Sequence, residues 1–286
     1  MKKVLLSFGA VAIAVAVAPM FAAFEAHVVN VTAKIENALQ VPIKFLDFGT
    51  VFPQEHLEQQ MSVSLSQSFL DEGRVDDVQY FIRQKPKCAI TTDNGQSYDA
   101  TVGQDGTHLY TGTGHLVLNQ ETGEVTIECG EAPRELTEGE IWGVLPSLCE
   151  YISKDGDSEF DRDGEDVDGN DSTTPSFHQP YEVVLNDNGT PQDPTDDFYE
   201  IVYLDTTGYL SKIVQDTDDN WVIDLAVPCF GGYCAQDWAA FVNSINPDAD
   251  PDQYTQDISN EHKVFGCDLW FEVSGVSLTP PPPDGV

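Results

Sequence analysis

Residues 61–66 read Met61-Ser62-Val63-Ser64-Leu65-Ser66, an alternation of large apolar and small polar side chains. Successive side chains of a β-strand point to opposite faces of the sheet, so this pattern places the three apolar residues on one buried face. The stretch Val78–Ile82 repeats the spacing with Val78, Tyr80 and Ile82. The two runs predict strands of a sheet that has one face in the core and one in solvent.

The same two-residue period recurs along much of the chain. Upstream, Val29, Val31, Ala33 and Ile35 alternate with polar residues, and Val41, Ile43 and Phe45 continue the pattern. Downstream, strands are predicted at Tyr98–Val102, Leu116–Leu118, Val125–Cys129, Tyr181–Leu185, Phe198–Leu204, Trp221–Val227 and Phe265–Val273.

One amphipathic helix is predicted over residues 237–246, because Trp238, Phe241, Val242 and Ile245 have helical spacing and Pro247 follows. Many short strands with one short helix and long acidic loop insertions predict an all-β fold, a jelly-roll or β-sandwich. No linker clearly divides residues 27–278, so we expect one elaborated domain, although the acidic loop 155–171 would separate two sandwiches in the alternative arrangement. The proline-rich end, residues 279–286, has no reason to fold.

The composition excludes some functions. The 286 residues include 49 acidic and 13 basic side chains, which gives a net charge of −36. A nucleic-acid partner is therefore not expected, since phosphate binding needs clustered Lys and Arg. A hydrophobic fraction of 41% excludes wholesale disorder.

Residues 1–26 form an export signal or an N-terminal membrane segment, with Lys2 and Lys3 preceding an almost purely apolar stretch from Val4 to Ala18. The protein is therefore expected to be secreted or displayed at the extracellular surface, and to contact a membrane only through this segment. The six cysteines agree with export, because an even number in an exported chain indicates disulfides. Cys229 can pair with Cys234 in a small loop, or either can pair with Cys267; the others are Cys88, Cys129 and Cys149.

The acidic loop is the one candidate metal site. Its stretch Glu159–Gly164 matches the first half of a calcium loop, but the twelfth position is Asn170 rather than a bidentate Glu. We expect calcium, and no other cofactor, to bind carboxylates drawn from Asp157, Glu159, Asp161, Asp163 and Asp168. The alternative is a solvated acidic run without metal.

Catalytic motifs are absent from the sequence. It has no H-E-x-x-H helix, no G-x-S-x-G elbow and no phosphate loop. His108 and His115 flank a short Gly-Thr turn, but a third metal ligand for them is not apparent. An enzyme is therefore not the favoured interpretation.

Phe48-Gly49-Thr50-Val51-Phe52-Pro53-Gln54-Glu55 is similar to an F-G-x-V-x-P-G-E/D turn, and Ala23-Phe24-Glu25 follows the export segment. Over roughly the first 85 residues this order resembles the TasA/camelysin family of exported bacterial proteins. Glu25 and Gln54 depart from that pattern, as do the six cysteines and the acidic middle. The resemblance implies a jelly-roll domain and matrix fibres built by donation of an N-terminal strand, and some members carry a metallopeptidase label.

The favoured function is a structural surface protein, a matrix-fibre or pilus-like subunit that associates with itself or with other cell-surface proteins. Its assembly strand would be residues 27–39, with Val29, Val31, Ala33 and Ile35 entering the acceptor. An extracellular binding or adhesion module is the alternative, with an aromatic patch drawn from Trp142, Trp221 or Trp270. A secreted metallopeptidase is the third, and only the family resemblance suggests it.

Overall fold

The computed structural model describes residues 34–92, 110–156, 173–188, 197–213 and 215–278. The chain divides into two compact units, Met1–Glu36 and Asn37–Val286, and only residues 34–36 of the first are described. The export segment, the strand predicted at Tyr98–Val102 and the tail 279–286 lie outside the described residues.

The alternation at residues 61–66 belongs to strand β2 (His56–Leu65), whose Met61, Val63 and Leu65 are buried as predicted. β2 pairs antiparallel with β11 (Asp218–Ala226), with Met61 opposite Trp221. A two-residue strand, β1 (Leu39–Gln40), pairs with the end of β2. These strands form a three-stranded sheet in the order β1-β2-β11.

The second sheet is built on β3 (Val75–Thr92), an 18-residue strand. Its first part lies between β10 (Thr206–Ser211) and β12 (Cys267–Leu278), and both pairings are antiparallel. Its last part pairs with β4 (Thr111–Thr113) and β7 (Glu140–Val144). One long strand therefore joins the sandwich to a smaller sheet region.

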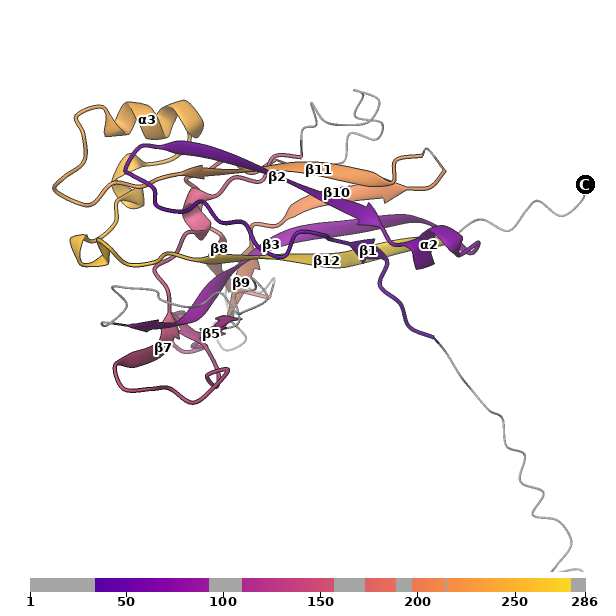
Figure 1. Cartoon of the computed structure of the whole chain (residues 1–286), viewed down its shortest axis with the longest axis horizontal. Coiled ribbons are helices and arrows are strands. Elements are labelled where there is room, and N and C mark those ends of the chain that lie inside the picture. Colours follow the sequence, from indigo (N-terminus) through magenta and orange to yellow (C-terminus); the bar gives the residue numbers. More distant parts are fainter. Residues whose placement is uncertain (1–33, 93–109, 157–172, 189–196, 214, 279–286) are drawn as a thin grey trace, which may run out of the picture. The chain divides into compact units, whose positions relative to one another are not determined.

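The hydrophobic core lies between the two sheets, which Figure 1 shows as layers. β2 and β11 supply residues from one side, and Val78, Tyr80 and Ile82 of β3 supply them from the other. Tyr80 donates its hydroxyl to Asp219 and accepts a hydrogen bond from Trp221 Nε1 at 2.8 Å. The predicted all-β fold with a sandwich arrangement is confirmed.

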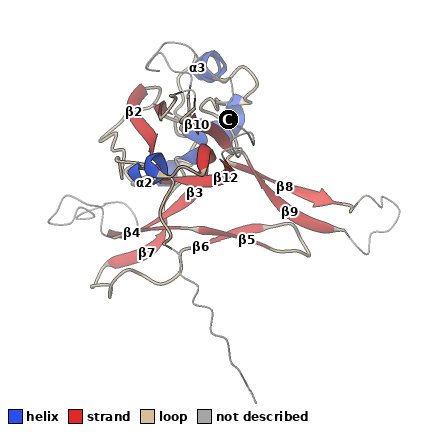
Figure 2. Cartoon of the chain, turned by 90° about the vertical axis from the view of Figure 1, so that its right-hand side faces the viewer, coloured by secondary structure: helices blue, strands red, loops and turns tan. Residues whose placement is uncertain are grey.

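Two hairpins stand apart from these sheets (Figure 2). They pair β5 (His115–Leu118) with β6 (Val125–Glu128), and β8 (Tyr181–Asn186) with β9 (Phe198–Tyr203). All four strands lie where alternation predicts them.

The described helices are short. The predicted helix is α3 (Trp238–Ile245), which buries Trp238 and Val242. α2 (Gln67–Asp71) connects β2 to β3, and the Ser66 hydroxyl caps its N-terminus by accepting a bond from the Phe69 N–H. Three 3₁₀ turns are η3 (Cys149–Tyr151), η4 (Pro251–Tyr254) and η5 (Ile258–Asn260). In the described part of the chain, no helix is long and apolar enough to cross a membrane.

The strand predicted to contain Val41, Ile43 and Phe45 is wrong, because residues 41–50 form no strand. This segment instead packs Val41, Leu46, Phe48 and Val51 irregularly against the core. Of the three alternating residues, only Val41 packs against the core, whereas Ile43 and Phe45 are exposed, so the alternation here reflects neither a strand nor a buried face.

The pattern also missed β4, β7 and β10, each of which contains a glycine that interrupts the apolar alternation. Gly208 of β10 lies directly opposite Tyr80, and a Cβ at this position would collide with the Tyr80 ring. Only glycine leaves room for the phenol ring at this position. This requirement comes from a distant residue, so the local sequence pattern does not reveal it.

All six cysteines are paired, as predicted. The bonds are Cys88–Cys129, Cys149–Cys267 and Cys229–Cys234. Of the two arrangements left open by the sequence, the small Cys229–Cys234 loop is the one that forms. Three disulfides indicate an oxidising environment.

Gly208→Ala tests the packing of Tyr80. The added methyl group has to displace the ring that hydrogen-bonds Asp219 and Trp221, so we expect a loss of about 1–3 kcal/mol or more in the free energy of unfolding. Denaturant titration of the oxidised protein measures it. Gly143→Ala in β7 is the control, because its Cβ would meet nothing within 4 Å. Equal effects of both substitutions would contradict the argument.

Candidate functional site

The two open sides of the sandwich, where the edge strands of the two sheets lie, are covered by different segments. On one side the end of β10 is bridged to the residues just before β11, through Ser211 and Asp216. On the opposite side the sheets end in β1–β2 and in β12. The irregular segment 41–55 connects β1 to the start of β2 on this side (Figure 1).

β2 has an edge that no described strand covers. The odd-numbered residues of β2 direct their backbone N–H and C=O groups toward β11, as the bond from Leu65 N to Thr217 O at 2.9 Å shows. Because alternate residues of an antiparallel strand bond to opposite neighbours, Glu58, Gln60 and Ser62 direct their N–H and C=O groups to the other edge. β1 reaches only Ser64 and Leu65 there.

The segment beside this edge contributes side-chain rather than ladder contacts. Gln59 Nε2 donates to the Asp47 carbonyl oxygen at 2.6 Å. Ile43, Phe45 and Phe52 of the same region remain exposed, Phe52 by 63%. An open backbone edge therefore lies next to exposed apolar side chains.

The predicted assembly strand is described only at its end. Val29, Val31 and Ala33 lie outside the described residues. Residues 34–37 form no strand, and Ile35 is 93% exposed. Of the predicted strand's described residues, Lys34–Ala38 form no strand, whereas Leu39 belongs to β1 and pairs with Leu65 of β2 within the same chain.

The five predicted calcium ligands, Asp157, Glu159, Asp161, Asp163 and Asp168, also lie outside the described residues. The base of their loop is defined, because Lys154 and Thr174 exchange two backbone hydrogen bonds of 2.8 Å. Asp155 pairs in turn with Val222 of β11. Both ends of the acidic loop are therefore fixed at the edge of β11.

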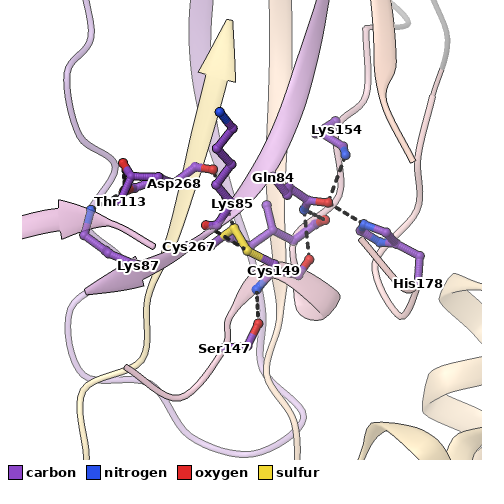
Figure 3. Close-up of a disulfide and its surroundings, with 11 residues drawn as sticks. Gln84, Lys85, Lys87, Thr113, Ser147, Cys149, Lys154, His178, Cys267 and Asp268 are labelled. Carbon is purple, nitrogen blue, oxygen red and sulfur yellow. Dashed lines mark hydrogen bonds and ion pairs between the residues drawn. A yellow bond between two sulfur atoms is a disulfide. The ribbon is translucent and has the colours of Figure 1, made fainter. Parts of the chain in front are cut away.

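A buried polar cluster lies at this loop base (Figure 3). Gln84, on the inward face of β3, accepts through Oε1 from Lys154 Nζ at 3.0 Å and contacts His178 Nε2 at 2.6 Å. Its amide nitrogen donates to the carbonyls of Cys149 at 2.8 Å and Ile152 at 3.3 Å. All three cluster side chains are buried.

Burial sets the charge state of this cluster. Desolvation lowers the pKa of Lys154 to about 7, although the negative charge of Asp205 opposes the shift. Desolvation, and then the positive charge of Lys154, lower the pKa of His178 to about 3, while its contact of 2.8 Å from Nδ1 to the Pro175 carbonyl works in the other direction. The cluster therefore disfavours positive charge at neutral pH.

The sequence-based predictions do not include this cluster, although the position of Gln84 in β3 is an indication of it. The inward positions of β3 run Val78, Tyr80, Ile82 and then Gln84. A polar residue that continues an inward-facing apolar series must find buried partners. What the sequence does not supply is the identity of those partners, which come from the loop base 70 and 94 positions away.

Of the three tryptophans offered for an aromatic patch, one cannot take part and the other two already make contacts within the chain. Trp221 is fully buried in the core, and Trp142 donates its Nε1 to the Gly130 carbonyl at 3.1 Å. Trp270 is 42% exposed, but the Lys85 ammonium lies 3.5 Å from its ring centroid. One ring face is therefore occupied by a cation of the same chain.

The remaining basic side chains of this outer face of β3 are paired. Arg83 forms two hydrogen bonds with Asp205, at 2.8 and 2.6 Å, and lies over the rings of Phe81 and Tyr203. Lys87 donates to Asp268 at 2.5 Å. The outer face is thus cross-linked by internal ion pairs.

The described residues contain no group of three or more His, Cys, Asp or Glu side chains arranged to hold a metal ion. His115 is exposed on β5, and its proposed partner His108 lies outside the described residues. Comparison with known proteins adds no relative, because no family model, curated protein or solved structure matches the chain.

The lowered pKa of His178 predicts an acid-sensitive stability. The unfolded chain binds a proton at this residue near pH 6.5, whereas the folded chain does so only near pH 3. Between these values the unfolded state binds more protons, so the free energy of unfolding falls as the pH falls.

Between pH 6.5 and pH 4, the protein should lose about 3 kcal/mol more than a His178→Gln variant does. Denaturant titrations of both proteins at the two pH values measure this difference. Parallel pH profiles of the two proteins would refute the assignment.

Proposed function

We propose that this protein is an exported, cell-surface structural subunit that assembles by strand addition. The observation that carries the proposal is the open edge of β2, where Glu58, Gln60 and Ser62 present backbone groups to no described strand. An unpaired edge is a template for pairing with another chain.

The donor is the predicted assembly strand 27–39 of a second copy, of which residues 27–36 are available for donation because Leu39 already pairs with β2 of its own chain. Its sequence pattern gives it one apolar face, made by Val29, Val31, Ala33 and Ile35. Adding this segment to β2 satisfies the backbone groups and brings the apolar face toward the exposed Ile43, Phe45 and Phe52.

Export supports this function. The apolar N-terminal segment directs the chain out of the cytoplasm, and three disulfides suit an oxidising exterior. The charge of −36 keeps subunits apart at low ionic strength, so assembly requires salt or divalent cations that screen it.

Two variants separate donor from acceptor. Val31→Asp with Ala33→Asp places charge on the donor face and leaves the β2 edge intact. Gln60→Pro removes an N–H that faces the open edge, and it spares the β11 ladder because residue 60 does not bond to β11.

Each variant alone should remain monomeric, whereas an equimolar mixture should form dimers and nothing longer, since one intact donor and one intact acceptor remain. Sedimentation velocity at physiological salt measures this, with Gln60→Ala as the polymerising control. Polymers formed by either variant alone would overturn the proposal.

Calcium is the proposed ligand of the acidic loop, and its fixed base at Lys154 and Thr174 holds the two ends of the loop together. Adding calcium should relieve carboxylate repulsion and raise the thermal midpoint. Asp161→Ala with Asp163→Ala should abolish the increase in a calorimetric scan, whereas Asp248→Ala, outside the loop, should not. An unchanged calcium response in the double variant would place the ion elsewhere.

A further inference from the structure

Lys154 places a primary amine beside an amide carbonyl, in a region that excludes solvent. Its side chain is 0% exposed, and its Nζ lies 3.0 Å from Oε1 of Gln84 (Figure 3). Within the described residues, no carboxylate lies within ion-pair distance of this amine, and Asp205 is engaged by Arg83. A buried ammonium without a counter-ion is costly, so the site favours the neutral amine, which is a nucleophile.

The Gln84 amide is held in the manner of an activated carbonyl. Its oxygen has two nitrogen neighbours, Lys154 Nζ and His178 Nε2, and the latter lies at only 2.6 Å. Its nitrogen is anchored by the carbonyls of Cys149 and Ile152. Donors fixed around an oxygen stabilise the negative charge that develops there during attack on the carbon.

The partners are also kept in place. Gln84 is 2% exposed within β3, and Lys154 is tied by its backbone to Thr174. The adjacent Cys149–Cys267 disulfide fixes η3, which carries one of the carbonyls that bind the amide. Such immobilisation converts a slow bimolecular reaction into an intramolecular one of high effective molarity.

We propose that Lys154 and Gln84 form an intramolecular isopeptide bond. The Nζ lone pair attacks Cδ of Gln84, a bond forms between these atoms, the Cδ–Nε2 bond breaks, and ammonia leaves. The Nε2–H of neutral His178 donates to the carbonyl oxygen, which gains negative charge during attack. One proton passes from Nζ to the departing Nε2 of Gln84, so that the products are a secondary amide and ammonia. No atom is oxidised or reduced, and no co-reactant is consumed.

The bond would join the centre of β3 to the base of the acidic loop, independently of the three disulfides. Such a link survives reduction and resists pulling along the chain. It goes beyond strand addition, because it is made within one subunit whether or not subunits assemble.

Peptide mapping of the full exported protein tests the proposal. After reduction and trypsin digestion, the Gln84–Lys87 peptide should be attached to the peptide containing Lys154, with a mass about 17 Da below the sum because ammonia is lost. Trypsin should also fail to cleave after Lys154, whose charge is gone.

Three variants complete the test. Lys154→Met should yield the Gln84–Lys87 peptide free, whereas Lys212→Met should leave the branched peptide intact, because Lys212 contacts only backbone carbonyls and an aromatic ring. His178→Gln should lower the rate of cross-linking after refolding at least about tenfold. A free Gln84–Lys87 peptide together with cleavage after Lys154 in the wild-type protein would overturn the proposal, whatever the variants do.

Discussion

The burial of one face of β3 is the constraint on which the rest of the structure depends. This strand runs through the second sheet and pairs with β10, β12, β4 and β7. Its inward face is not wholly apolar, because Tyr80 and Gln84 lie in it, so the opposite sheet and the loop base must supply hydrogen-bond partners. Trp221 and Asp219 of β11 are the hydrogen-bond partners of Tyr80, and His178 is a partner of Gln84.

The outward face of β3 carries basic side chains in a chain that is otherwise strongly negative. Arg83 and Lys87 are paired with carboxylates, and Lys85 lies over an indole ring. Scarce basic residues are therefore placed where they connect neighbouring strands of one sheet. A basic surface for binding polyanions does not arise from this arrangement, since each cation is already engaged within the sheet.

The two proposals concern different parts of the chain and different properties, namely association of subunits and strength of the single subunit. The proposed strand addition would use an edge of β2 that no described strand covers, and it would join one subunit to the next. The link between Gln84 and Lys154 would strengthen the interior of each subunit, in a core already joined by disulfides. If the chain is the structural subunit proposed above, the two features would serve one purpose, because such subunits must hold to one another and also resist unfolding.

The sequence by itself determined the all-β class, most strands, helix α3 and the oxidised state of all six cysteines, because these follow from local periodicity and composition. It left open which cysteine pairs with which. Tertiary structure alone decided the remainder. Gly208 interrupts the apolar alternation of β10 because a side chain there would collide with the Tyr80 ring. Residues 41–50 contain apolar residues but form no strand, because they pack irregularly against the side of the sandwich. The Gln84 cluster likewise needs residues far apart in the chain, and no local pattern records which distant side chains will share one buried space.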